Sequence, residues 1–341
     1  MEKIQTSEYC AVGHPDRTCD YIASFILDRY LEKDPDARVA LEVQLIDTYC
    51  RVAGEVTSSW KFTVSEIAEF CRDAVRKIGY TDDYRDVFGA DNAISGSDLE
   101  VEVFISQQST DIAQGVNREG WGDQGIQWGM AVKSPETGNM PLDYYLARRI
   151  ANELVSRNLG GLDVKTQVTC ADGKPVEVVV AIPLTDEMPL EDVEKTVREF
   201  VGDEAKVTVN GTGRFVKHGS IGDCGTTGRK LVVDFYGGNA RIGGGSPWGK
   251  DPTKADVTLN IYARIRALKY LEENGLDEVH CAISCCIGKS EIRVSFYDKE
   301  NHLLETEVES EPPSHIIDEL GLKFPGYADR CAGGLFGFEN A

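Results

Sequence analysis

The chain has no long apolar run and is short of positive charge. Across its 341 residues no hydrophobic stretch approaches the ~18 residues of a membrane span, and the start MEKIQTSEYC has neither the basic end nor the apolar stretch of a signal peptide. Only 36 Lys and Arg stand against 57 Asp and Glu, and the formal net charge of −21 repels phosphate backbones unless a local basic patch overrides it. We therefore expect a cytoplasmic protein with no membrane and no nucleic-acid partner.

A zinc-binding or disulfide framework is also missing. The ten Cys include no C-x-x-C pair, and the nearest cluster, Cys281, Cys285 and Cys286, lies in a strand-like run without zinc-ligand spacing. We interpret the cysteines as reduced structural thiols. With 41 % hydrophobic and 27 % charged residues, the composition is that of a folded protein with room for two or three domains.

Helix and strand patterns occur in the same order three times. In the first unit Thr63 and Glu66 form a capping box at the start of an amphipathic helix. The predicted helix, strand, strand and helix are 16–31, 39–46, 51–57 and 63–78, then 142–154, 166–170, 176–182 and 190–201, then 255–271, 280–287, 291–297 and 315–320. The repetition predicts an α/β (α+β) fold of three similar αββα-type domains around a pseudo-threefold axis, with limits at 1–112, 118–217 and 218–341.

Two segments, 107–129 and 211–254, lie outside the units, and the second collects positive charge. Between positions 214 and 254 seven Lys or Arg oppose three Asp, a local balance of +4. This stretch also holds ten of the 34 Gly, whose backbone N–H groups approach anions closely. It is either a cradle for a polyphosphate or a basic surface loop.

A partial phosphate-binding motif lies at 244–250, between an expected strand over 231–235 and a helix. It fits the G-x4-G-K skeleton, but Asp251 stands where a metal-binding Ser or Thr belongs. This disfavours an ordinary P-loop kinase or hydrolase, and we expect the lysines to meet phosphates as side-chain charges.

Three polar residues precede or open predicted helices. Asp16, in Gly13-His14-Pro15-Asp16, and Asp256 are either Mg²⁺ ligands beside phosphates or plain N-terminal helix carboxylates. His14 is placed to present an imidazole to a ligand, although alone it does not decide the question.

Further motifs are spread along the whole chain. They are Gln107-Gln108-Ser109-Thr110-Asp111-Ile112, Gly122-Asp123-Gln124-Gly125, Lys165-Thr166-Gln167-Val168-Thr169, Gly213-Arg214-Phe215-Val216, Gly222-Asp223, Gly228-Arg229-Lys230, Gly243-Gly244-Gly245 and Gly249-Lys250-Asp251 with Lys254. Together with Gly13-His14-Pro15-Asp16 they resemble the S-adenosylmethionine synthetase (methionine adenosyltransferase) family from end to end.

The resemblance implies a fold, a reaction and cofactors. The fold is three α/β domains around a pseudo-threefold axis, in a homodimer or dimer of dimers with active sites at the subunit interface. The substrates are ATP and L-methionine: sulfur attacks C5′ of ATP, and the expelled triphosphate is hydrolysed to diphosphate and phosphate. A thioether carries no proton, so alignment and charge stabilisation replace a general base. The implied cofactors are Mg²⁺, about two per site, and K⁺.

By resemblance, each candidate residue takes a role. His14 would hydrogen-bond the leaving O5′ and triphosphate, and Glu42, by spacing a mere strand residue, would hold K⁺. Phe215, otherwise a core aromatic, would stack on adenine. The phosphate-binding residues would be Lys165, Arg229, Lys230, Lys250 and Lys254, the Mg²⁺ ligands Asp16 and Asp256, the ribose or nucleotide contacts Asp163 and Asp223, and the methionine-binding residues Glu55, Gln108 and Asp123.

The chain departs from the family pattern in several places. Ala11-Val12 and Arg17 replace Ser-Glu and Lys, Leu45-Ile46-Asp47-Thr48 replaces Ala-Lys-Thr-Gly, and Val257 replaces Arg. The segment 117–123, which includes Trp121, is several residues shorter than usual. Two alternatives therefore stay open: an adenosyltransferase that prefers a methionine analogue, and a non-catalytic nucleotide-binding regulatory homologue.

Overall fold

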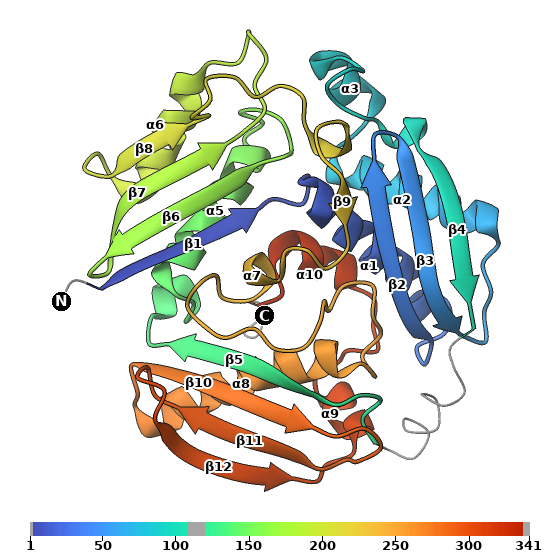
Figure 1. Cartoon of the computed structure of the whole chain (residues 1–341), viewed down its shortest axis with the longest axis vertical. Coiled ribbons are helices and arrows are strands. Elements are labelled where there is room, and N and C mark those ends of the chain that lie inside the picture. The colour runs from blue at the N-terminus through green and yellow to red at the C-terminus, as the bar shows by residue number, and fades with distance from the viewer. Residues whose placement is uncertain (1–2, 108–119, 337–341) are drawn as a thin grey trace.

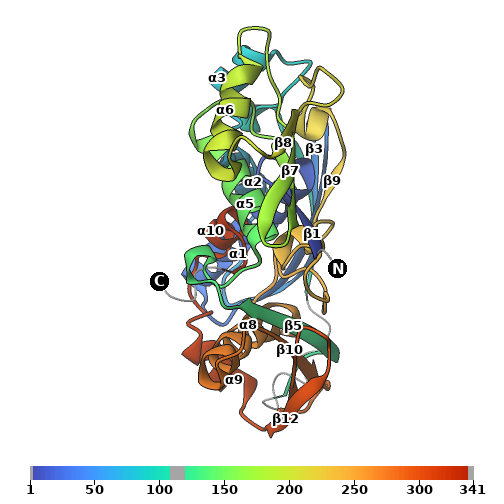
Figure 2. The same ribbon diagram turned by 90° about the vertical axis from the view of Figure 1, so that its left-hand side faces the viewer.

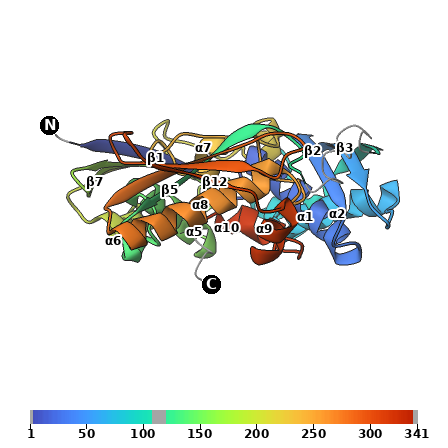
Figure 3. The same ribbon diagram turned by 90° about the horizontal axis from the view of Figure 1, so that it is seen from below.

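The structure is a computed structural model that describes residues 3–107 and 120–336. Three four-stranded sheets surround a common centre (Figure 1). The molecule is thin when turned on its side (Figure 2). From below, the sheets lie toward one side of it and most helices toward the other (Figure 3).

The first sheet is built around an antiparallel hairpin. Its elements in spatial order are β9 (Gly225–Thr226), β2 (Arg38–Ile46), β3 (Tyr49–Thr57) and β4 (Glu100–Ser106), with helices α1 (Pro15–Lys33) and α2 (Val64–Ile78) on one face. Val39, Leu41, Val43 and Leu45 are buried against the helices, and the residues between them face the open side. The predicted Thr63–Glu66 capping box starts α2.

The second sheet repeats this arrangement. Its elements are β1 (Ile4–Cys10), β6 (Lys165–Ala171), β7 (Lys174–Ala181) and β8 (Lys206–Val209), with helices α5 (Leu142–Ser156) and α6 (Leu190–Val201). The outer strand β8 is parallel to β7, as β4 is to β3. The apolar stripe Val193, Val197 and Val201 of α6 is buried, as its helical spacing requires.

The third sheet differs at its outer edge. Its elements are β5 (Gly125–Val132), β10 (Glu278–Cys285), β11 (Ile292–Tyr297) and β12 (Leu303–Glu309), with helices α8 (Ala255–Asn274) and α9 (Pro313–Glu319). Here the outer strand precedes the second helix and is antiparallel to its neighbour.

Each sheet takes one edge strand from a distant part of the chain. β1 pairs with β6, β5 pairs with β10, and β9 pairs with β2. The exchange is cyclic, so it ties the three units together, and no cut in the sequence separates complete sheets. The three-unit α/β fold is confirmed, and the limits at 112, 118, 217 and 218 stay a prediction.

Helix α1 lies at the centre and is buried along most of its length, because β2, β9, α2 and the C-terminal helix α10 (Tyr327–Gly333) surround it. The carboxylate of Asp28 accepts the N–H groups of Gly326, Tyr327 and Ala328 at 2.8–3.0 Å. It therefore fixes the start of α10 against α1.

All twelve helices and strands of the three predicted units are present, with ends that shift by a few residues. The expected strand over 231–235 is wrong: α7 (Leu231–Asp234) is a short helix in which Asp234 and Phe235 donate to Lys230 and Leu231. Five residues, Leu-Val-Val-Asp-Phe, are too short for hydrophobic periodicity to tell a strand from a helix. A short helix, α3 (Asp82–Phe88), follows α2. Within the described residues, no helix is both long and apolar enough to cross a membrane.

Candidate active site

Asp16 is a buried carboxylate in the first turn of α1 and faces strand β9. Its Oδ1 accepts the N–H of Thr226 at 2.9 Å, and its Oδ2 accepts Lys230 Nζ at 2.8 Å. Arg229 Nε lies 3.6 Å from Oδ1. The structure therefore brings together three residues that the sequence pattern could only name separately.

His14 is the N-cap of the same helix. Its Nδ1 accepts the N–H of Asp16 at 3.2 Å. Burial, reinforced by the charge of Lys230, lowers the pKa of His14 to about 3, against the opposing charge of Asp16. The ring is therefore neutral at pH 7, and because Nδ1 accepts, we assign the proton to Nε2.

A glycine allows β9 to approach this helix start. A Cβ on Gly225 would lie only 2.2 Å from the carbonyl oxygen of Pro15. Any side chain at position 225 would therefore push β9, and with it Arg229 and Lys230, away from Asp16.

Lys165 opens β6 and forms an ion pair with Glu8 of β1, with 3.0 Å between Nζ and Oε2. Both side chains are partly exposed, so the pair adds little stability and leaves the ammonium open to an anion. The charge of Lys165 also contributes to the low pKa of His14. Glu8 was missed in the sequence, because only the pairing of β1 with β6 reveals its partner.

Asp163 is buried beside the same strand. Its Oδ2 accepts the N–H of Gly219 at 2.9 Å. Burial raises the pKa of Asp163 to about 7, although that hydrogen bond opposes the rise, and nearby Asp223 adds to it. Asp223 is exposed, and its Oδ1 accepts the N–H of Cys224 at 2.8 Å.

His218 is a second residue that sequence reasoning missed. Its Nδ1 lies 2.6 Å from the carbonyl oxygen of Val216, and its Nε2 lies 2.6 Å from Tyr84 Oη. A carbonyl only accepts, so we assign the proton to Nδ1 and have the Tyr84 hydroxyl donate to Nε2. Tyr84 Oη also accepts the N–H of Leu162 at 2.9 Å. This chain of bonds fixes the segment that carries half-buried Phe215, whose ring lies 6.4 Å from the imidazole.

A second cluster forms where α8 begins. Lys250 Nζ lies 2.6 Å from Asp256 Oδ2, and the other oxygen of Asp256 accepts the N–H of Gly245 at 2.8 Å. Lys250 forms an isolated antiparallel bridge with Ala40 of β2. Glu42 follows on the same open face; burial raises its pKa, and the charge of Lys250 opposes that rise.

Asp251 has a structural position. It is fully buried, and its Oδ2 accepts the N–H of Val39 at 2.8 Å and Lys254 Nζ at 2.9 Å. It therefore fastens the loop to β2. The loop 244–250 follows the short helix α7, so no strand leads into it as in a P-loop. Helix α8 starts only at Ala255, so Lys250 does not lie at the helix start as a P-loop lysine does.

Of the three residues that the resemblance assigns to methionine, the structure describes Glu55 and Asp123, and within the described residues no hydrogen bond or ion pair joins them. Glu55 lies on the open face of β3, opposite Ala40. Asp123 is exposed just before β5, with its carbonyl oxygen 3.6 Å from Cys285 Sγ. Gln108 lies outside the described residues.

We name two clusters from these contacts. The N-terminal cluster is His14, Asp16, Lys165, Arg229 and Lys230, and the C-terminal cluster is Glu42, Lys250, Lys254 and Asp256. Among residues 3–107 and 120–336, no hydrogen bond or ion pair joins one cluster to the other. In each, a lysine ammonium lies against a carboxylate where a cation is favoured, so the oxygen donors fit Mg²⁺ and the lysines fit phosphate.

Two departures from the family pattern belong to the core. Arg17 is fully buried between Asp20 and Asp234, donates to the carbonyl oxygen of Cys331 at 2.6 Å and lies over the ring of Trp248. Val257 is also buried. The change at position 17 therefore alters packing beneath the helix start and leaves the exposed charges unchanged.

Known proteins resemble this chain in both sequence and fold. The sequence pattern of the S-adenosylmethionine synthetase N-terminal domain matches residues 2–110, and that of the C-terminal domain matches residues 217–341. The S-adenosylmethionine synthase of Wolinella succinogenes is 36 % identical over 372 aligned residues, which cover 99 % of this chain and 94 % of the relative. That of Helicobacter pylori is 34 % identical, covering 98 % and 93 %. A solved structure described as an unusual S-adenosylmethionine synthetase from Campylobacter jejuni has a TM-score of 0.87 and 29 % identity, covering 99 % of this chain and 95 % of its own.

Proposed function

This chain belongs to the S-adenosylmethionine synthetase family, and we propose that it is a methionine adenosyltransferase, which forms S-adenosylmethionine from ATP and L-methionine and releases diphosphate and phosphate. The observation that carries the proposal is the contact of Lys230 and Arg229 with Asp16 beside His14. It places cations, a carboxylate and a neutral imidazole around one helix start.

His14 acts on the leaving group. Its neutral ring presents Nε2–H, which hydrogen-bonds the oxygen that leaves C5′. The methionine sulfur has no proton to lose, so no residue acts as a general base. Lys165, Arg229 and Lys230 stabilise the charge that grows on the triphosphate, and Lys250 and Lys254 supply the remaining phosphate contacts.

Asp16 and Asp256 hold Mg²⁺ in this proposal, and the ion supplies charge neutralisation on the phosphate oxygens. Glu42 holds K⁺ on the open face of β2. Phe215 stacks on adenine, and Asp163 and Asp223 contact the ribose side of the nucleotide. Glu55, Asp123 and Gln108 bind methionine, where a carboxylate near sulfur favours the developing sulfonium cation.

The active site is completed by a second copy of the chain, in a homodimer or dimer of dimers. Within the described part of one chain, no hydrogen bond or ion pair joins the two clusters, although the proposed reaction needs both. The open face of the first sheet carries Phe104, Tyr49 and Ile46, which are 58 %, 59 % and 47 % exposed. Exposed apolar groups of this kind mark protein interfaces. Pairing through this face sets the N-terminal cluster of one copy against the C-terminal cluster of the other.

Two alternatives have less support. A preference for a methionine analogue was suggested by the shortened segment 117–123 and by Trp121, but the Trp121 side chain is fully buried, and the backbone N–H of Trp121 donates to the carbonyl oxygen of Lys289. A regulatory homologue without catalysis would not need both lysine–carboxylate pairs. We place the protein in the cytoplasm as part of the same proposal.

The test is to incubate the protein with ATP, L-methionine, Mg²⁺ and K⁺ and to identify products by mass spectrometry. S-adenosylmethionine, phosphate and diphosphate in equal amounts are expected. Formation of ADP, or ATP binding without any product, would overturn the proposal. The same assay with ethionine distinguishes the analogue-preferring alternative by the ratio of kcat/KM values.

A further inference from the structure

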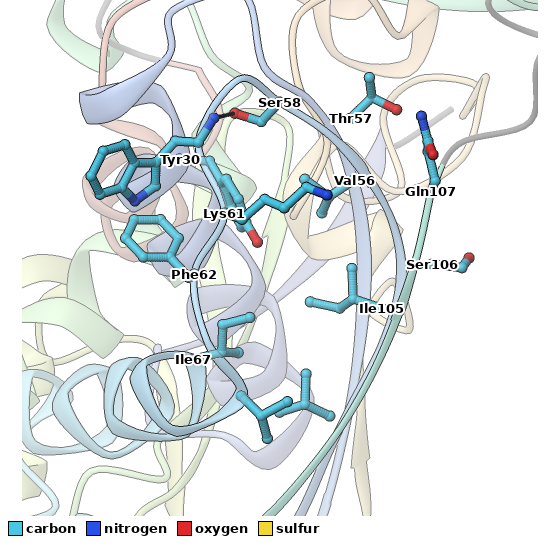
Figure 4. Close-up of a pocket in the computed structure, with 13 residues that line it drawn as sticks. Tyr30, Val56, Thr57, Ser58, Lys61, Phe62, Ile67, Ile105, Ser106 and Gln107 are labelled. Atoms are coloured by element: carbon cyan, nitrogen blue, oxygen red, sulfur yellow. Dashed lines mark hydrogen bonds between the residues drawn. The ribbon is translucent and has the colours of Figure 1, made fainter.

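A cavity of about 330 Å³ opens at the end of the first sheet, and none of its lining residues belongs to either cluster (Figure 4). One wall comes from the ends of β3 and β4, and the other from the loop that leads into α2. Its size lies in the range of small-molecule sites.

Part of the lining is apolar because α2 begins too late to cover the sheet, and Thr57, Ser58, Lys61, Ser106 and Gln107 make the rest of it polar. Val56, Val103 and Ile105 point to the helix side of the sheet, but the first residue of α2 is Val64, and these three side chains remain only partly buried. Phe62 packs edge-to-face on Tyr30 at 4.9 Å between ring centres. The result is a recess with an apolar side, formed by these side chains and the aromatic pair, and a polar side.

The loop over the recess is held in one conformation. The carboxylate of Asp34 accepts Ser58 Oγ at 2.7 Å and the N–H of Ser59 at 2.6 Å, and the N–H of Trp60 donates to Ser58 Oγ at 3.1 Å. A site whose walls are already ordered loses little entropy when a ligand binds.

Two hydrogen-bond donors at the cavity lack a protein partner among the described residues. Figure 4 shows the Lys61 side chain extending across the cavity toward Val56, and neither Lys61 Nζ nor Tyr30 Oη has a hydrogen bond or ion pair there. Burial, with the charge of Glu66, raises the pKa of Tyr30, so the phenol remains a donor. An exposed ammonium and a phenol that line the same partly apolar recess are complementary to a carboxylate that carries an apolar group.

We propose that this cavity binds a small hydrophobic carboxylic acid, with its apolar body against Val56, Ile105 and Phe62 and its carboxylate on Lys61 and Tyr30. At roughly 30 Å³ for each water-sized group, the cavity holds about ten such groups, which suits a phenylalkanoate or medium-chain fatty acid. This site is independent of the proposed adenosyl transfer.

Isothermal titration with 4-phenylbutyrate and its uncharged counterpart 4-phenylbutan-1-ol tests the proposal. The acid should bind the wild-type protein with a dissociation constant on the order of 0.1–1 mM and about tenfold more tightly than the alcohol. Lys61→Met keeps the apolar stem and removes the charge, so it should remove the tenfold difference and leave binding of the alcohol unchanged. Ile105→Trp fills the recess and should abolish binding of both.

Lys195→Met is the matched control, because Lys195 is exposed on α6 and has no role here; it should bind both probes like the wild type. Formation of S-adenosylmethionine by Lys61→Met without a probe should equal the wild-type rate, so a failed adenosyl transfer reaction is told apart from a failed cavity proposal. Equal affinity for acid and alcohol, tight binding of the acid by Lys61→Met, or no binding at all would each overturn the proposal. A change of oligomeric state in Lys61→Glu would instead make the cavity an interface between copies and would also refute it.

Discussion

Lys230 donates to Asp16 across 2.8 Å at the start of the helix that His14 caps. Asp16 is fully buried and the Lys230 side chain is mostly buried, so each charge depends on the other for compensation. The same pairing occurs between Lys250 and Asp256. In the proposed reaction, a divalent cation would take the place of the ammonium at the carboxylate, and a polyphosphate would take the place of the carboxylate at the ammonium.

Replacing Asp16 by Asn should abolish turnover and preserve the fold. The amide keeps an oxygen for the N–H of Thr226 but removes the negative charge that pairs with Lys230 and would hold Mg²⁺. We expect kcat to fall by roughly 10³-fold or more, with an unchanged far-ultraviolet circular dichroism spectrum. Asp192→Asn, also an acid in the first turn of a helix, is the control and should stay active. Near-normal kcat in Asp16→Asn would remove Asp16 from the site.

Replacing His14 by Asn should lower kcat by roughly 10²-fold or more while changing KM for ATP only a few-fold. The imidazole contacts the charge that develops during bond breaking, so its loss affects the transition state more than binding. Because the pKa of His14 is about 3, no loss of wild-type activity should follow its protonation between pH 8 and pH 5.5. Steady-state kinetics across this range measure both effects, and a variant in which only KM rises would contradict the assignment.

Replacing Tyr84 by Phe should raise KM for ATP several-fold with little change in kcat. The Tyr84 hydroxyl donates to His218 and accepts the N–H of Leu162, so it links the segment that carries Phe215 and His218 to Leu162. Its loss removes this link. It also leaves two buried polar groups unpaired, at a cost of about 2 kcal/mol in the free energy of unfolding. Tyr145→Phe, on the exposed side of α5, is the control. An unchanged KM in Tyr84→Phe would show that the tyrosine has only a structural role.

The stability of the protein should depend on His218 in acid. Burial lowers its pKa to about 4, below the usual value near 6.5, so the unfolded chain binds a proton that the folded chain does not. The resulting loss of stability begins as the pH falls below 6.5 and reaches on the order of 2 kcal/mol at pH 5. The melting temperature of His218→Gln should therefore fall less steeply than that of the wild type as the pH is lowered from 7 to 5. If the melting temperatures of the two proteins fell in parallel with pH, this would contradict a buried neutral imidazole at His218. Asp163, whose pKa is raised, acts in the opposite direction in both proteins.

The repeated units could be predicted because each helix and hairpin has a local signature, such as the Thr63 capping box or the alternation in β2. The exchange of β1, β5 and β9 could not, because it depends on pairing between segments far apart in the chain. β12 was missed since Leu303–Glu309 is a largely exposed edge strand that presents no buried apolar face.

The site was predictable where a motif fixes residue types and not where tertiary contacts decide their role. His14, Asp16 and Lys230 were each named as candidates from their motifs, and their contacts with one another became visible only in the structure. The role of Asp251 could not be predicted from the sequence, because its burial against Val39 arises only when the loop crosses β2. His218 had no signal, since its partners Tyr84 and Val216 come from separate segments.

The most direct test of the account mixes two inactive variants, Asp16→Asn and Lys250→Met. Each should be inactive alone, and Lys195→Met should behave as the wild type. If one active site combines the N-terminal cluster of one copy with the C-terminal cluster of its partner, mixed dimers contain one intact site. An equal mixture, unfolded and refolded together, should then recover about a quarter of wild-type S-adenosylmethionine formation. No recovery, with mixed dimers shown to be present by native mass spectrometry, would mean that each site is built within one chain and would contradict the account.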